Sequence, residues 1–240
     1  MKQTIRKRKS TRNYTGVPVE EPLLGKVSAH LKELKPLYPN IAVHAEIVTK
    51  EQVRCFFPWT PPQFIAVYSE EADGYLENVG FLFQQMDLYL QSMGLGVCWI
   101  GMGRMSENEP DLIRQNPALK FVILLAFGYP KDTAWRQDAS EFKRHELSQI
   151  ADTEDERLEP ARLAPSSINS QPWYFTHEGD VYHAYRTQPT RIKSLVGMNR
   201  IDMGIALAQL FVENPDTFRF FSVDSPAKIK GCHYTGSFCL

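Results

Sequence analysis

The chain has 240 residues, of which 43% are hydrophobic and 23% are charged, and its formal net charge is −1. These values are typical of a globular protein with a buried core, and they exclude the strongly basic surface that nucleic acid or an anionic membrane would attract. The longest apolar run, residues 121–127, is much shorter than the ~18 residues of a membrane span, and the basic residues 1–10 are not followed by the apolar region of a signal peptide. The four cysteines show no paired spacing, so we expect free thiols and a cytoplasmic location.

Residues 1–68 predict one helix and two strands. Acidic residues beside Pro22 predict a helix over residues 20–32, because proline and negative charge both favour a first helical turn. Residues 41–48 alternate in polarity and predict a strand, and residues 64–68 predict a second one. The aromatic loop Phe56-Phe57-Pro58-Trp59 is either a candidate pocket wall for a flat ligand or a buried hydrophobic loop.

The strongest helical pattern covers residues 79–93. Apolar side chains recur there at i, i+3, i+4 and i+7 spacing and so share one face, and the glycines at 94 and 96 predict the end of the helix. A compact apolar stretch follows at residues 97–101, and then a polar helix near residues 110–115. Residues 121–127 predict a buried strand that ends in a turn.

The rest of the chain predicts a second structural half. Residues 131–141 are polar and predict an exposed loop, and the acidic residues 152–159 predict a linker or a surface helix between the halves. The elements expected after it are strands at 173–177 and 181–185, a helix at 202–212 and a strand at 218–223.

Two helical segments resemble each other. Residues 77–85 and residues 201–209 both place a small polar residue two positions before a glycine, and both continue as an apolar helix that reaches a glutamine. Either an internal repeat or a chance likeness between two amphipathic helices explains this similarity.

Several familiar catalytic and binding motifs are incomplete. The glycines at residues 94–103 do not have G-x-G-x-x-G spacing, and a helix rather than a strand precedes them. His145-Glu146 lacks the second histidine of a zinc-protease motif, and no Gly-x-Ser-x-Gly elbow is present. We therefore expect neither a metal site nor a serine hydrolase.

Two polar segments remain. In an extended segment Arg8, Ser10 and Arg12 would lie on one side and suit a phosphate, although a solvated basic tail also explains them. The run Ala-Pro-Ser-Ser-Ile-Asn-Ser-Gln-Pro-Trp at residues 164–173 has hydroxyl and amide groups that can hold the polar edge of a planar ligand. The alternative is a helix end that leads into a turn and a strand.

Together these segments resemble the FMN-dependent nitroreductase family. The resemblance spans nearly the whole chain, in residues 5–14, 78–101, 127–130, 143–147 and 164–173. In ordinary members the Pro-Ser-Ser-x-Asn-x-Gln-Pro-Trp motif lies near the N-terminus, soon after an Arg-Arg-Ser-x-Arg element, whereas here it lies in the second half of the chain. This order is similar to the TM nitroreductase subgroup, in which two halves of one chain imitate the homodimer of ordinary members.

The resemblance implies an α+β fold of three layers, with a mainly antiparallel sheet flanked by helices and two pseudo-repeated halves that both contribute to it. The halves would be residues 1–150 and residues 151–240. The first lacks its own Pro-Ser-Ser-x-Asn motif and the second its own Arg-x-Ser-x-Arg, so each supplies what the other lacks. The resemblance therefore implies one FMN site per chain and a plausible monomer, with further dimerisation left open.

The resemblance also assigns roles to particular residues. The FMN phosphate and ribityl chain would contact Arg8, Ser10, Lys143 and Arg144, and Lys9, which stands where the family usually has Arg or His. Arg12 would lie near the pyrimidine edge of the flavin, and the ring would contact Trp99, Ile100, Gly101, Pro165, Ser166, Ser167 and Asn169. Gln171 would brace the turn, and a backbone N–H in the stretch of residues 99–101 would be directed toward flavin N5, so no side chain is nominated as a catalytic acid or base.

The function that the resemblance implies is a two-stage oxidoreduction. NAD(P)H would reduce FMN, and a nitroaromatic, a quinone or a similar acceptor would then take the electrons. Three alternatives stay open: a flavin store or sensor without efficient turnover, a flavin-consuming or deiodinating branch of the superfamily, and a structural protein that has lost the site. The intact basic and hydroxyl residues argue against the last of these.

Overall fold

The computed structural model describes residues 1–55, 59, 61–106, 111–133, 135–188 and 195–240. Three residues of the candidate aromatic wall, Phe56, Phe57 and Pro58, lie outside the described residues. Within the described part of the chain, none of the helices has the length and apolar character that a bilayer crossing requires. All four cysteines are free thiols, as the sequence predicts.

The N-terminal half forms a four-stranded antiparallel sheet with one long helix. The sheet has the order β1-β3-β6-β4, and the helix α3 joins its second and third strands along the chain. The main elements are α1 (Lys2–Ile5), α2 (Glu21–Leu31), β1 (Val43–Thr49), β3 (Gln63–Glu70), α3 (Tyr75–Ser92), β4 (Gly96–Ile100) and β6 (Leu119–Gly128). The short pieces are η1 (Lys50–Gln52), β2 (Val53–Arg54), β5 (Arg104–Met105), α4 (Asp111–Gln115) and η2 (Ala139–Glu141).

The C-terminal half repeats this topology. Its sheet has the order β7-β8-β10-β9, and the helix α7 again lies between the second and third strands in the sequence. The elements are η3 (Glu156–Leu158), α6 (Glu159–Arg162), η4 (Ser167–Asn169), β7 (Trp173–Glu178), β8 (Val181–Thr187), α7 (Leu195–Glu213), β9 (Arg219–Phe221) and β10 (Cys232–Cys239). The short helix α5 (Leu147–Ile150) lies just before them, at the end of the first half. Both sheets therefore connect strand, strand, helix, strand and strand in the same spatial order.

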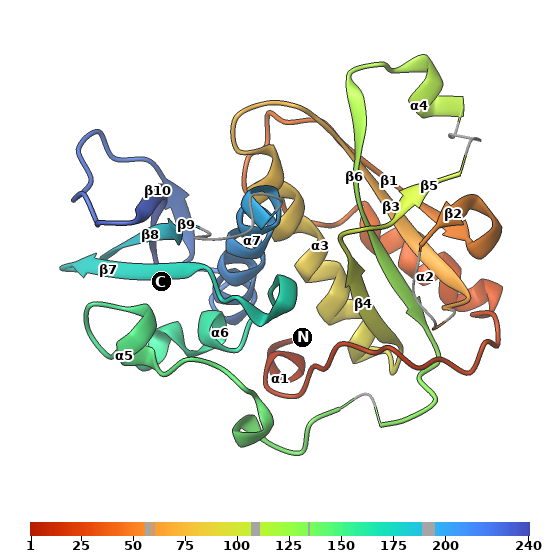
Figure 1. Cartoon of the computed structure of the whole chain (residues 1–240), viewed down its shortest axis with the longest axis horizontal. Coiled ribbons are helices and arrows are strands. Elements are labelled where there is room, and N and C mark those ends of the chain that lie inside the picture. Colours follow the sequence, from red (N-terminus) through yellow and green to blue (C-terminus); the bar gives the residue numbers. More distant parts are fainter. Residues whose placement is uncertain (56–58, 60, 107–110, 134, 189–194) are drawn as a thin grey trace.

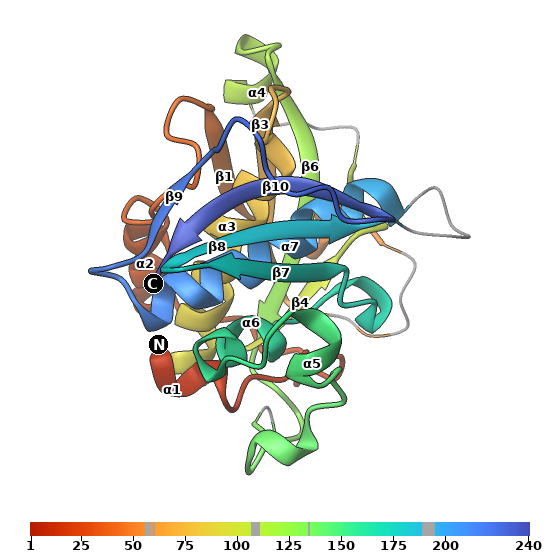
Figure 2. The same cartoon turned by 90° about the vertical axis from the view of Figure 1, so that its left-hand side faces the viewer.

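The α+β class and the pseudo-repeated halves agree with the sequence prediction, but the sheets differ from it in one respect. Each half builds its own sheet instead of contributing to a shared one. The helices α3 and α7 pack along each other between the two sheets (Figure 1). Figure 2 shows the C-terminal sheet from its outer side, with both helices behind it. One apolar core runs through all the layers, from Val67 of β3 to Phe238 of β10.

The contact between α3 and α7 explains the sequence likeness between the two helices. A Cβ atom added to Gly80 would lie 2.0 Å from the carbonyl oxygen of Ile201, and one added to Gly204 would lie 2.0 Å from the carbonyl oxygen of Glu77. Each glycine thus faces the residue that lies three positions before the glycine of the other helix. An approximate two-fold axis between the helices requires this reciprocal arrangement. An ion pair between Arg200 Nε and Glu77 Oε1, at 2.7 Å, also joins the two helices.

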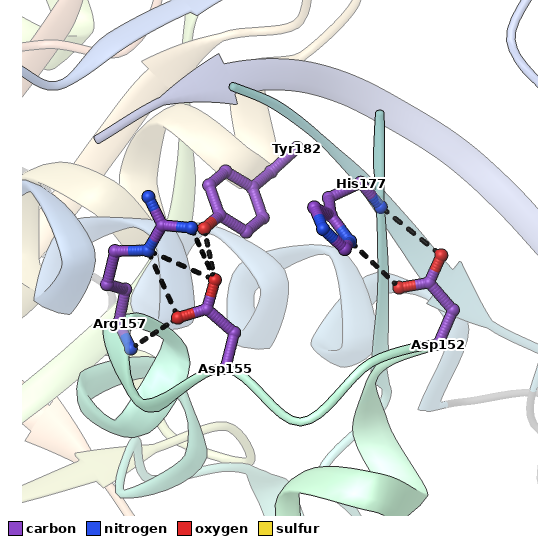
Figure 3. A network of polar contacts seen from close by, with 5 residues as sticks. All are labelled: Asp152, Asp155, Arg157, His177 and Tyr182. Atoms are coloured by element: carbon purple, nitrogen blue, oxygen red, sulfur yellow. Dashed lines mark hydrogen bonds and ion pairs between the residues drawn. The ribbon is translucent and has the colours of Figure 1, made fainter. Parts of the chain in front are cut away.

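The acidic segment at residues 152–159 is not a free linker. Asp155 accepts hydrogen bonds from the Tyr182 hydroxyl and the Arg157 side chain, and Asp152 contacts His177 (Figure 3). Tyr182 and His177 belong to β8 and β7, so the segment is attached to the C-terminal sheet from its first residues.

Element boundaries differ from the sequence predictions mainly by extension. The helix expected at residues 202–212 begins at Leu195, and β10 was not predicted because its alternation is interrupted near Gly236, where the register shifts. The expected exposed loop at 131–141 contains a β-bridge between Trp135 and Arg8, and the Arg136 side chain is half-buried.

Candidate functional site

The N-terminal basic segment is held along the edge of the N-terminal sheet. Ser10 forms a parallel bridge with Val97 of β4, and the Thr11 N–H donates to the Val97 carbonyl oxygen at 2.9 Å. This pairing brings the side chains of residues 8–12 next to the end of β4. The segment is therefore part of the fold and not a solvated tail.

Arg8 is fixed by a buried carboxylate on α3. Its side chain is 1% exposed, its Nε lies 3.5 Å from Asp87 Oδ1, and its Nη2 donates to Ser10 Oγ at 3.3 Å. Asp87 also accepts hydrogen bonds from Trp99 Nε1, at 3.1 Å, and from the Gln91 amide. Sequence reasoning missed Asp87, although an acidic residue one turn after Phe83 in an apolar helix is a recognisable signal of a buried polar partner.

The loop between α6 and β7 carries the Pro-Ser-Ser motif in a constrained conformation. Ile168, Asn169 and Gln171 have positive φ angles of 49°, 60° and 47°, which are rare for residues other than glycine. The Ser166 hydroxyl accepts the Gln171 N–H at 2.9 Å, and Gln171 Oε1 accepts the His145 N–H at 2.7 Å. These contacts hold the loop against residues 143–145.

Arg144 connects the same loop to the basic residues. Its Nε donates to the Ala164 carbonyl oxygen at 2.9 Å, and its Nη1 donates to Asn169 Oδ1 at 2.6 Å. Asn169 in turn donates its amide to the Lys143 carbonyl oxygen at 2.9 Å. The guanidinium therefore lies between the Pro-Ser-Ser loop and the N-terminal segment, beside Arg8 and Arg136.

A cleft of two adjoining lobes lies between these elements. The basic lobe has a volume of about 540 Å³ and is lined by Arg8, Lys9, Ser10, Arg12, Arg136, Glu141, Lys143, Arg144, Pro165, Ser166, Ile168 and Asn169. The narrow lobe, of about 140 Å³, is lined by Ser10, Arg12, Cys98, Trp99, Gly101, Ile123, Pro165, Ser166, Ser167, Ile168, Met198, Ile201, Asp202 and Ile205. The lobes share five residues, and both halves of the chain line each lobe.

The basic lobe is strongly positive. Six of its lining side chains are basic and one, Glu141, is acidic. Burial lowers the pKa of Arg144 to about 9, with further lowering from the positive charges of Arg8, Arg136 and Arg162. Burial, together with Arg8, also lowers the pKa of Arg136. These guanidinium groups repel one another, so a bound anion would stabilise the arrangement.

The narrow lobe contains two groups whose pKa values burial has raised. The pKa of the Cys98 thiol is raised to about 11, against the opposing effect of Arg12. The pKa of Asp202 is raised to about 8, although the Ser167 N–H, which lies 3.0 Å from Oδ1, opposes the shift. Both groups are therefore predominantly protonated at pH 7.

The structure gathers most of the sequence-predicted residues around this cleft. Two do not line it: Ile100 points into the apolar cluster on the other face of the sheet, and Gln171 is buried behind the loop that it contacts. Lys9 lines the basic lobe with an exposed side chain whose Nζ donates to the Thr133 carbonyl oxygen at 3.4 Å. Arg136 and Asp202 line the cleft and were not predicted, since neither belongs to a contiguous motif.

Several solved structures are similar to this chain, and the first described here shares its fold over nearly the whole length. A putative nitroreductase from Thermotoga maritima has a TM-score of 0.65 and 19% identity, over 99% of this chain and 91% of that one. A nitroreductase family protein from Clostridium difficile 630 has a TM-score of 0.46 and 19% identity, over 62% of this chain and 95% of that one. A structure named FMN-dependent nitroreductase, from Clostridium difficile R20291, has a TM-score of 0.46 and 18% identity, over 60% and 95%.

The sequence comparisons give a family assignment. No curated protein matches the chain. A family model described as "Putative TM nitroreductase" matches residues 1–213, which include the basic segment, α3, the Pro-Ser-Ser loop and α7. The chain therefore belongs to the putative TM nitroreductase family.

Proposed function

We propose that this chain is an FMN-dependent oxidoreductase with one cofactor site, formed jointly by its two halves. The observation that carries the proposal is the cleft, in which the basic segment of one half faces the Pro-Ser-Ser loop of the other. The halves we assign are residues 1–150 and residues 151–240. In this arrangement the second half takes the place of a partner subunit.

The chemistry of the basic lobe fits a phosphate group. Its volume of about 540 Å³ lies within the ~300–1,000 Å³ that is common for small-molecule sites. Guanidinium groups bind phosphate oxygens through paired N–H donors, and Arg8 is already oriented by Asp87. A dianionic phosphate would also reduce the repulsion between Arg144, Arg8 and Arg136. We therefore assign phosphate binding to Arg8, Ser10, Lys143 and Arg144, with Arg136 as an added donor.

The narrow lobe fits one edge of a planar ring. Ser166 and Ser167 line it on one side, and Trp99 and Gly101, at the end of β4, line it on the other. Arg12 lines both lobes, and we assign its positive charge to the pyrimidine edge of the ring. A positive charge there favours negative charge on a bound flavin, which raises its tendency to accept electrons.

Bound FMN would supply two-electron chemistry at its N5 atom, with a hydride taken from NAD(P)H and passed to a nitroaromatic, a quinone or a similar acceptor. The residues of the chain bind and orient the cofactor, and we assign no side chain the role of acid or base. Of the candidate aromatic wall, the structure describes Trp59, and the centre of its ring lies 6.2 Å from the centre of the Tyr14 ring.

A visible absorption spectrum tests this proposal. The purified protein, or the protein after addition of FMN, should show flavin absorbance that anaerobic NAD(P)H bleaches and that a quinone restores. A colourless protein that does not bind added FMN would contradict the proposal. A yellow protein that NAD(P)H does not bleach would identify a flavin store or sensor, and loss of flavin absorbance under oxygen would identify a flavin-consuming enzyme.

A further inference from the structure

Asp202 is a buried carboxyl group in the wall of the cleft. It lies in α7, the residue is 3% exposed, and it lines the narrow lobe, as Ser10 and Trp99 do. Both of its oxygens face the Ser167 N–H, at 3.0 and 3.1 Å. The group thus joins the helix to the Pro-Ser-Ser loop and still has hydrogen-bonding capacity left.

No basic group among the described residues pairs with Asp202. The cation in the narrow lobe, Arg12, lies beside Cys98, and the nearest basic residue on α7, Arg200, is bound to Glu77. A buried carboxylate without a cation is costly, so such a group takes up a proton instead. The raised pKa of Asp202, about 8, agrees with this geometry.

The N-terminal half shows which side chain is enough to attach such a loop to a central helix. Asn78 of α3 matches Asp202 in the repeat, and its Oδ1 accepts the N–H groups of Leu37 and Tyr38, at 2.8 and 3.0 Å. An amide therefore suffices to attach the loop to the helix. A neutral carboxyl group performs the same task with its carbonyl oxygen and offers an O–H donor as well.

We propose that Asp202 is a ligand-binding residue that, as a neutral carboxylic acid, donates its O–H to a carbonyl oxygen or an unprotonated ring nitrogen of the planar ligand in the narrow lobe. The inference rests on the proposed function, because a flavin ring carries acceptors of both kinds. Ionisation of Asp202 removes the donor and places a negative charge against these acceptors. Ligand affinity should therefore fall as the pH rises. The other titratable groups that line the narrow lobe are Arg12 and Cys98, and the pKa of the Cys98 thiol is raised to about 11, so the thiol stays neutral up to about pH 9. In the basic lobe the pKa of Arg144 is about 9, so its loss of charge weakens phosphate binding only near pH 9, and it does so in Asp202→Asn as well.

Titration of the apoprotein with FMN at a series of pH values tests the inference. Between about pH 6.5 and about pH 9 the dissociation constant should rise roughly fivefold to tenfold, the size expected for one hydrogen bond. Asp202→Asn should remove most of this pH dependence, because an amide donates at every pH. Asn78→Asp is the matched control: it places a carboxylate at the corresponding position away from the cleft and should leave the wild-type pH profile unchanged.

Infrared spectroscopy of the apoprotein gives a second, ligand-free measurement. The difference between wild type and Asp202→Asn at pH 7 should contain the carbonyl band of a protonated carboxylic acid, which disappears at alkaline pH. An ionised Asp202 at pH 7, or an FMN affinity that does not change as the band disappears, would overturn the inference. Absence of FMN binding at any pH would instead overturn the proposed function, and the infrared result would show separately whether Asp202 is neutral.

Discussion

The loops at residues 34–40 and 163–169 occupy matching positions in the two halves but share only part of their side chains. Their sequences are Leu-Lys-Pro-Leu-Tyr-Pro-Asn and Leu-Ala-Pro-Ser-Ser-Ile-Asn, so the leucine, the first proline and the asparagine coincide. Each loop is attached by backbone N–H groups to the matching residue of a central helix: Tyr38 N–H to Asn78, and Ser167 N–H to Asp202. The N-terminal half thus has a counterpart of the Pro-Ser-Ser loop in which Leu37 and Tyr38 replace the two serines.

The two loops differ most in side-chain volume at one matching position, which is Tyr38 in the first loop and Ser167 in the second. The Tyr38 ring packs edge-on against Phe220 of β9, with 5.6 Å between the ring centres. On another side the ring lies close to Gly74, where an added Cβ atom would come within 2.7 Å of a Tyr38 ring carbon. Ser167 at the matching position is small and lines the narrow lobe. At this one position, therefore, a large ring fills the space in the N-terminal half, and a small side chain leaves the narrow lobe open in the other half.

The central helices provide the largest test of this two-fold relation. Gly204→Ala should lower the free energy of unfolding by about 3 kcal/mol, since the new methyl group would meet a backbone oxygen that only a shift of α3 against α7 can move. Gly80→Ala should cost a similar amount, because the two contacts are equivalent. Chemical denaturation measures both variants.

Gly25→Ala is the control for the helix pair. Gly25 lies inside α2, and nothing outside its own helix lies within 4 Å of the position that a methyl group would take. Alanine should therefore stabilise the protein by ~0.5–1 kcal/mol through helix propensity. Clearly unequal losses at Gly80 and Gly204 would contradict the equivalence of the two helices.

The difference between the two loops predicts an effect of intermediate size on FMN binding. Replacing Ser166 and Ser167 together by alanine should weaken FMN binding about tenfold, a loss of ~1.4 kcal/mol, because the ring loses two hydroxyl partners. The effect should be the same at all protein concentrations, since both sides of the cleft belong to one chain. Fluorescence titration measures it.

Tyr38→Phe is the matched control in the other loop. It keeps the ring that packs on Phe220 and should leave FMN affinity and the ratio of one FMN per chain unchanged. Weaker binding in this variant, or an effect of the serine variants that depends on protein concentration, would contradict a single site made within one chain.

The sequence predicts the elements of the molecule better than it predicts their long-range contacts. Helical periodicity located α3, and stretches of apolar residues located β3 and β6. These patterns could not show that Asp87 reaches Arg8, or that Arg136 returns to the backbone of residues 7–8, because these contacts join residues far apart in the chain. The predicted site residues came from contiguous motifs, and those that were missed, Asp87, Arg136 and Asp202, stand outside such motifs.

The smallest expected effect concerns the hydrogen bonds of Asp155, a contact of the C-terminal half that has no counterpart among the described residues of the N-terminal half. Burial opposes ionisation of Asp155, but hydrogen bonds from Arg157 and Tyr182 outweigh it and lower its pKa to about 2 (Figure 3). Because this value lies below the ~3.9 of an unfolded aspartate, the ionised group stabilises the fold above about pH 4, and the stabilisation is lost as the pH falls toward 2. Asp155→Asn should therefore lower the free energy of unfolding at neutral pH and flatten the decline of this free energy between pH 4 and 2, as measured by urea unfolding.

Asp224→Asn, at an exposed site after β9, is the control and should leave that decline unchanged. An equally steep decline in Asp155→Asn would show that other carboxylates cause the acid sensitivity, and that the segment before the Pro-Ser-Ser loop does not depend on this contact.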